Sequence, residues 1–120
     1  MIALVDARNV VRSRWPNLEE ARFLELTHRW AEREGIQALV VFDGRAPAFE
    51  ADERITVTGT GGESADDRIA AEAKRLAGEG HRLWLVSSDR GLRTRVEPYV
   101  ERTIGGGTFA GLLEALAGRN

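Results

Sequence analysis

The sequence contains no cysteine, no long apolar run and no export signal. Disulfide bonds, thiolate metal ligands and cysteine nucleophiles are therefore excluded. No stretch approaches the roughly 20 apolar residues that a membrane-spanning helix needs. Residues 1–6 lack the basic start and long apolar run of a secretory signal, and no small-residue cleavage site follows. These absences predict a cytoplasmic protein that does not interact with a membrane.

Lysine is nearly absent as well. Lys74 is the only lysine among 17 basic residues, which stand against 19 acidic residues and give a net charge of −2. An arginine-rich set suits planar, bidentate contacts with phosphate or carboxylate groups, although a GC-rich genome explains it equally well. The overall charge therefore neither requires nor excludes a nucleic-acid partner.

The chain has 120 residues, of which 42% are hydrophobic, enough for a single domain over 1–120 with a real core. Short apolar runs alternate with segments of helix length. The expected strands are 2–5, 36–42, 54–58, 82–86 and 103–104. The expected helices are 18–34 with Asn17 as its cap, 65–77 capped by Ser64, 90–97, and 109–117 capped by Thr108. Polar loops are expected at 7–16 and 45–53. This order predicts an α/β fold with a mostly parallel sheet and helices on both faces.

Three of the apolar runs end at an aspartate, at Asp6, Asp43 and Asp89. The carboxyl ends of parallel strands share one edge of the sheet, where open α/β folds bind ligands. One such aspartate means little, because aspartate is common in turns and helix caps. Three of them on one edge favour a functional site.

A fourth acid comes from the helix that follows Ser64. Ala65, Ile69 and Ala73 mark its buried face at about 100° per residue. Asp66 then falls roughly 50° from the centre of that face and Asp67 roughly 150° away. We therefore expect Asp66 to point toward the strand ends, and Asp67 to cap the helix or assist from further out.

Clustered carboxylates repel one another, and a bound cation relieves that repulsion. Oxygen-only ligands favour Mg²⁺ or Mn²⁺ over zinc. Such ions activate water and stabilise charge on phosphoryl oxygens, so hydrolysis of a phosphodiester is the natural chemistry. Arg8, Arg45 and Arg90 each lie within two residues of a strand-end acid and are the preferred phosphate contacts.

Two further residues stand out near the acids. Ser88 adjoins Asp89 and is a candidate ligand for a metal, a water or the substrate. Trp15 could stack on a base, but packing beside Pro16 is the favoured interpretation. The two histidines, His28 and His81, lie far from any of these acids in sequence and are not expected to be catalytic.

Four segments together resemble the NYN domain family of PIN-like ribonucleases, and its bacterial YacP-like branch most closely. They are Leu4-Val5-Asp6-Ala7-Arg8-Asn9-Val10-Val11, Val40-Val41-Phe42-Asp43-Gly44, Glu63-Ser64-Ala65-Asp66-Asp67-Arg68-Ile69 and Val86-Ser87-Ser88-Asp89. The resemblance covers nearly the whole chain and keeps the order and spacing of the segments. Ala7 departs from the pattern, since the family usually has glycine at that position.

The resemblance implies a three-layer α/β/α PIN-like fold and a metal-dependent ribonuclease that acts on single-stranded or structured RNA. Asp6, Asp66 and Asp89 match the metal-binding acids. The other matching catalytic positions are Asn9, Asp43 and Asp67. A PIN-like toxin of a toxin–antitoxin pair and a non-catalytic RNA-binding relative are the alternatives. The sequence does not specify the oligomeric state.

Phosphatases and phospho-accepting receiver domains also place acids at strand ends. The aspartyl-phosphatase pattern requires an aspartate two residues after the first, where this chain has Arg8. A receiver requires paired acids at the first strand and a late lysine at a strand end, and the sequence has neither. The pattern therefore favours the nuclease.

Overall fold

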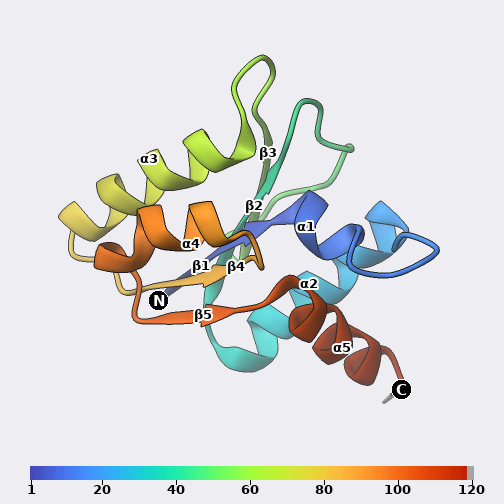
Figure 1. Cartoon of the computed structure of the whole chain (residues 1–120). Helices are drawn as coiled ribbons and strands as arrows, with labels where there is room; N and C mark the ends of the chain where they lie inside the picture. The colour runs from blue at the N-terminus through green and yellow to red at the C-terminus, as the bar shows by residue number, and fades with distance from the viewer. Residues whose placement is uncertain (119–120) are drawn as a thin grey trace.

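The short apolar segments form one sheet in which every strand runs parallel to its neighbours (Figure 1). A computed structural model describes residues 1–118. The strands within that range are β1 (Ile2–Asp6), β2 (Gln37–Phe42), β3 (Ile55–Gly59), β4 (Leu83–Val86) and β5 (Arg102–Ile104), in the order β3-β2-β1-β4-β5. The central β1 is buried along its whole length, as its unbroken apolar sequence predicts.

Helices cover both faces of the sheet (Figure 1). The helices are α1 (Ala7–Val11), α2 (Glu20–Glu34), α3 (Ala65–Gly78), α4 (Arg90–Val96) and α5 (Gly106–Ala117), with a 3-10 turn at Glu97–Tyr99. Helices α1, α2 and α5 share one core, in which Trp30 meets Phe109 edge to face at 4.8 Å between ring centroids. Helices α3 and α4 pack on the opposite face around Ile69 and Leu92. The expected three-layer α/β/α arrangement is confirmed, and the described sheet is wholly parallel.

The segment after Asp6 was expected to be a loop, and this was wrong. Residues 7–11 form the short helix α1, because Ala7, Val10 and Val11 have helical spacing and are all buried against the sheet. Arg8 and Asn9, which lie between Ala7 and Val10, obscured that spacing in the sequence. The true loop covers 12–19.

Two helix starts also differ from expectation. Helix α2 begins at Glu20 with Glu19 as its cap rather than at Leu18 after Asn17, and the Leu18 N–H bonds to the Val11 carbonyl. Helix α5 begins at Gly106, two residues before the expected Thr108 cap, because the Ser88 hydroxyl accepts the Gly106 N–H. In both cases the backbone near the helix start bonds to a residue outside the helix, a contact that the local pattern does not show.

Trp15 does not pack beside Pro16 as predicted. Its side chain is 93% exposed, whereas Leu18 fills the apolar position beside the core. The packing interpretation was wrong because the loop places Leu18, not Trp15, over the hydrophobic interior.

The side of the sheet on which strands are added changes at β1. It proceeds from β1 outward to β2 and β3, then crosses back to β4 on the other side of β1. The carboxyl ends of β1 and β4 therefore flank a topological switch point, where ligands bind in open α/β sheets. Within residues 1–118 no helix is long and apolar enough to cross a bilayer.

Candidate active site

A cavity of about 530 Å³ opens at the carboxyl ends of β1, β2 and β4. Four of the acids singled out in the sequence line it. The lining residues are Asp6, Arg8, Asn9, Arg12, Ser13, Asp43, Ser64, Ala65, Asp66, Ser88 and Asp89. Residues that are far apart in the chain thus meet in one solvent-connected space.

Asp6 is the most deeply placed of these acids. It ends β1 and is buried, with only 6% of its surface exposed. Burial raises its pKa above the usual value, and the nearby carboxylates of Asp66 and Asp89 raise it further, while a hydrogen bond from Ser87 opposes the shift. A buried carboxylate among like charges is a group whose charged form a cation would stabilise.

Asp66 and Asp67 are neighbours in sequence but lie in different environments. Asp66, in the first turn of α3, lines the cavity, and burial together with the charge of Asp89 raises its pKa. Asp67 lies outside the lining and pairs with Arg95 of α4 at 2.9 Å. The Asp67 backbone N–H, not its side chain, takes part in the helix cap by donating to Ser64 Oγ at 3.1 Å.

Asp89 and Asp43 each accept a hydrogen bond from the first turn of a helix, and both line the cavity. Asp89 caps α4, with Oδ1 accepting the Leu92 N–H at 2.8 Å. Asp43 Oδ1 accepts the N–H of Ala65, the first residue of α3, at 3.1 Å. A carboxylate has roughly four acceptor sites, so one such bond leaves capacity for a ligand.

Asn9 of α1 and Ser88, which follows β4, both line the cavity and bond to each other. Asn9 Oδ1 accepts the Ser88 N–H at 2.8 Å, and Ser88 Oγ accepts the Gly106 N–H at 2.7 Å. A side chain at Gly106 would place its Cβ 2.1 Å from Asn9 Oδ1, so only glycine leaves room for this contact. The chain of bonds fixes α1, the turn after β4 and α5 relative to one another.

Ser87 is a residue that the sequence analysis missed. Its fully buried hydroxyl donates to Asp6 Oδ2 at 2.8 Å, and its Oγ accepts the Asp89 N–H at 3.1 Å. Residues two apart in an extended segment share a face, so Ser87 rather than Ser88 lies on the same face as Asp89. This alternation is the feature of the sequence from which Ser87 could have been identified as a site residue.

The arginines divide into two groups. Arg8 lines the cavity, where it pairs with Glu20 at 3.1 Å and lies 5.8 Å from the Phe42 ring centroid. Arg12, not among the preferred contacts, also lines the cavity. Arg45 and Arg90 are exposed and do not belong to the lining. Two cationic side chains thus stand beside the acids.

The donor set fits a hard divalent cation in its chemistry, since it consists of carboxylate oxygens with nearby hydroxyl and amide oxygens. Among residues 1–118, no three His, Asp or Glu side chains are drawn together closely enough to surround one ion as they stand. The acids are close enough in space to raise one another's pKa, as Asp6 and Asp66 show.

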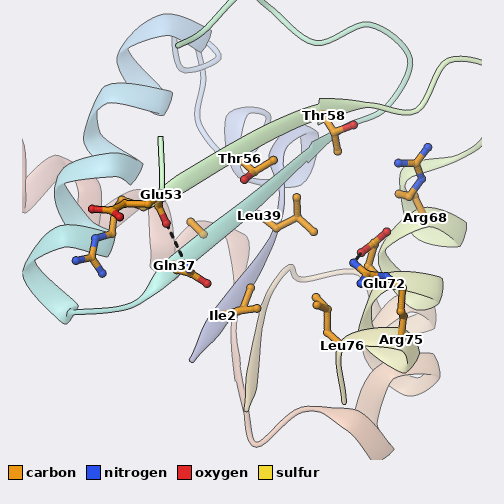
Figure 2. A pocket seen from close by; sticks show the side chains of 12 residues that line it. Ile2, Gln37, Leu39, Glu53, Thr56, Thr58, Arg68, Glu72, Arg75 and Leu76 are labelled. Atoms are coloured by element: carbon orange, nitrogen blue, oxygen red, sulfur yellow. Dashed lines mark hydrogen bonds and ion pairs between the residues drawn. The ribbon is translucent and has the colours of Figure 1, made fainter. Parts of the chain in front are cut away.

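A second cavity, of about 380 Å³, lies between α3 and the β2–β3 end of the sheet (Figure 2). Arg68, Glu72 and Arg75 project from α3 on one side, and Thr56 and Thr58 of β3 lie on the other. Its two α3 arginines are engaged in ion pairs with glutamates. The strand-end aspartates do not line it, so it is separate from the candidate site.

No family model matches the chain, and no curated protein sequence does either. Solved structures do match. Rae1 (YacP) from Bacillus subtilis shares 20% identity over 99% of this chain and 76% of its own, with a TM-score of 0.75. A single-residue mutant of that protein shares 24% over 98% and 77%, with a TM-score of 0.71. The T5 D15 protein, co-crystallised with metal ions, shares 15% over 85% of this chain and 53% of its own, with a TM-score of 0.58. At these identities the likeness shows a shared fold, and YacP is also the branch that the four sequence segments resemble.

Proposed function

We propose that this chain is a metal-dependent ribonuclease that hydrolyses RNA phosphodiester bonds in the cavity lined by Asp6, Asp66 and Asp89. The observation that carries the proposal is the convergence of these three carboxylates at the topological switch point of a YacP-like fold. Burial, and after it the charge of neighbouring carboxylates, raises the pKa of Asp6 and of Asp66, which supports a site where a cation would be favoured. The metal ions in crystals of the T5 protein, which has the same fold, are consistent with this reading.

Asp6, Asp66 and Asp89 are the residues that would hold one or two Mg²⁺ or Mn²⁺ ions, with Asp43 at the rim. When bound, such an ion activates water and offsets charge on phosphoryl oxygens. In the hydrolysis a water oxygen adds to phosphorus and one bridging P–O bond breaks, and the leaving oxygen gains a proton.

The chain's own cations would bring the substrate to the acids. Arg8 and Arg12 line the cavity and offset the repulsion between its carboxylates and a phosphate. The Arg8 guanidinium donates to Glu20 at 3.1 Å and lies 3.5 Å from the Asp43 carbonyl oxygen, and these two acceptors orient it beside the cavity. Arg45 and Arg90 are exposed and lie outside the cavity lining. They are proposed to contact phosphates of the RNA that are further from the bond that is cut.

Asn9 and Ser88 are proposed to act by position rather than by direct chemistry. Their bonds hold the turns that carry Asp6 and Asp89. Asp67 is directed toward Arg95 and would assist only by orienting α3 and α4.

Labelled single-stranded RNA, structured RNA and DNA of the same sequence, incubated with Mn²⁺ or Mg²⁺, test the proposal. Wild type should cleave RNA, and EDTA should abolish cleavage. Asp66→Asn should lower kcat/KM roughly 100-fold or more, because it removes a carboxylate from the metal site. Asp67→Asn makes the same change at the next residue and is the matched control. Its kcat/KM should stay within a few-fold of the wild-type value.

Cleavage that persists in EDTA, or equal activity of wild type and Asp66→Asn, would exclude the metal mechanism. RNA binding without any cleavage would favour a non-catalytic relative.

A further inference from the structure

Trp15 is exposed to a degree that is unusual for tryptophan, at 93% of its side-chain surface. Trp30, by contrast, is buried in the core between Phe109 and Trp84. Within residues 1–118 the other large apolar side chain that is exposed is Leu112, at 42%. Covering a large aromatic surface transfers it out of water, which is favourable, so a ligand that packs on Trp15 would gain binding free energy.

The exposure of Trp15 does not come from a loosely held loop. On one side, Arg14 pairs with Glu114 of α5 at 3.0 Å and donates to the Gly107 carbonyl at 3.2 Å. On the other side, the Leu18 N–H bonds to the Val11 carbonyl at 3.1 Å. Figure 1 shows the blue loop between α1 and α2 projecting from the body of the molecule. Trp15 is therefore presented on a loop that is anchored at both ends.

The same loop begins in the candidate active site. Arg12 and Ser13, the first two residues of the loop, line the acidic cavity. The Arg12 guanidinium is exposed and makes no ion pair or hydrogen bond within the part of the chain that the structure describes. Arg14, in contrast, is engaged by Glu114. Along the chain, an available cation thus lies between Asp6 of the cavity and the exposed indole of Trp15.

We infer that Trp15 is a stacking platform for an unpaired base of a single strand whose phosphate lies at Arg12 and whose backbone continues into the acidic cavity. The inference rests on the proposed ribonuclease function and specifies the form of RNA that the site accepts. A base can cover the indole only when it is not stacked within a duplex. An aromatic platform beside a cation is the arrangement by which proteins bind single strands without reading their sequence.

Binding in EDTA tests this inference without requiring cleavage. A fluorescently labelled single-stranded RNA and a blunt duplex of the same sequence are titrated with the full chain. Trp15→Ala should weaken single-strand binding roughly five- to 100-fold, the usual range for loss of one stacked base, and leave duplex binding unchanged. Trp15→Phe should retain most of the affinity because it keeps an aromatic face, whereas Trp15→Leu should not.

Leu112→Ala removes another exposed apolar side chain, outside the acidic cavity, and should bind as wild type does. Unchanged unfolding temperatures would show that the Trp15 variants fold, as expected for a side chain with few contacts. The inference is overturned if Trp15→Ala binds the single strand as tightly as wild type, if Trp15→Leu binds as well as Trp15→Phe, or if wild type binds no single strand. It is also overturned if the substitution changes self-association instead, as measured by light scattering.

The two proposals fail separately. Trp15-dependent binding without cleavage in Mn²⁺ or Mg²⁺ contradicts the ribonuclease and supports the platform. If wild type cleaves RNA but Trp15→Ala binds the single strand as tightly as wild type, the result supports the ribonuclease and contradicts the stacking platform.

Discussion

The hydroxyl of Ser87 donates a hydrogen bond to Asp6 Oδ2 at 2.8 Å, joining two residues that are 81 positions apart. The parallel pairing of Val5 with Val86 brings the ends of β1 and β4 side by side, so the contact follows from the strand order. The same Ser87 oxygen accepts the Asp89 N–H. One buried hydroxyl therefore fixes the two strand-end acids relative to each other.

Ser87→Ala should reduce both stability and activity. It leaves a buried Asp6 oxygen and the Asp89 N–H without a partner, which costs roughly 1–3 kcal/mol in the free energy of unfolding. Loss of such a supporting contact lowers metal affinity or activity roughly 10- to 100-fold. Urea unfolding and RNA cleavage measure the two effects. Ser13→Ala is the control, because Ser13 lines the cavity but its hydroxyl donates to the Val10 carbonyl and not to an acid. Equal effects of the two variants would contradict the role given to Ser87.

Gly106→Ala and Gly107→Ala should have opposite effects. A Cβ at Gly106 meets the Asn9 side chain at 2.1 Å and should destabilise the protein by about 1–3 kcal/mol through displacement of that side chain. A Cβ at Gly107 has only an ordinary contact at 3.8 Å, with Arg14. Within a helix, alanine should be neutral there or stabilise by about 0.4–1 kcal/mol. Thermal unfolding distinguishes the pair, and a stable Gly106→Ala protein would show that Asn9 is not confined.

Asp66→Asn should stabilise the metal-free protein in a pH-dependent manner. The pKa of Asp66 is raised in the folded state, so its charged form is less favourable there than in the unfolded chain. This penalty is fully present above the raised pKa and disappears as the pH falls below the ordinary value of 3.8. The unfolding temperature of Asp66→Asn in EDTA should therefore exceed that of wild type at pH 7.5, with a difference that shrinks toward pH 4. A difference that is constant with pH would contradict this origin.

Mg²⁺ or Mn²⁺ should raise the unfolding temperature of wild type. A ligand that binds only the folded state stabilises it by mass action, and about 1 kcal/mol corresponds to roughly 4 °C in a domain of this size. Millimolar Mn²⁺ should therefore give a shift of several degrees in differential scanning fluorimetry. Asp66→Asn should lose most of the shift and Asp67→Asn should keep it. NaCl at matched ionic strength controls for general screening, and an equal shift with NaCl would argue against a specific site.

Much of the fold follows from local sequence. The apolar runs that end at Asp6, Asp43 and Asp89 predicted three strand ends on one edge of a parallel sheet, and the strands lie as expected. Helical phase separated Asp66 from Asp67, and the structure places only Asp66 in the cavity lining. Such inferences succeed because strand alternation and helical periodicity depend on neighbouring residues alone.

The sequence by itself therefore determined the succession of the five strands and the four longer helices along the chain, and the strand-end and helix positions of the acids. Only the tertiary structure decided what lies beside them. It brought Ser87 within hydrogen-bond distance of Asp6, and Asn9 into contact with Ser88 and Gly106. It also left Trp15 exposed while Leu18 packs against the core. These contacts depend on which strands are neighbours and on how loops are anchored, and no local periodicity encodes an interaction between residues some 80 positions apart.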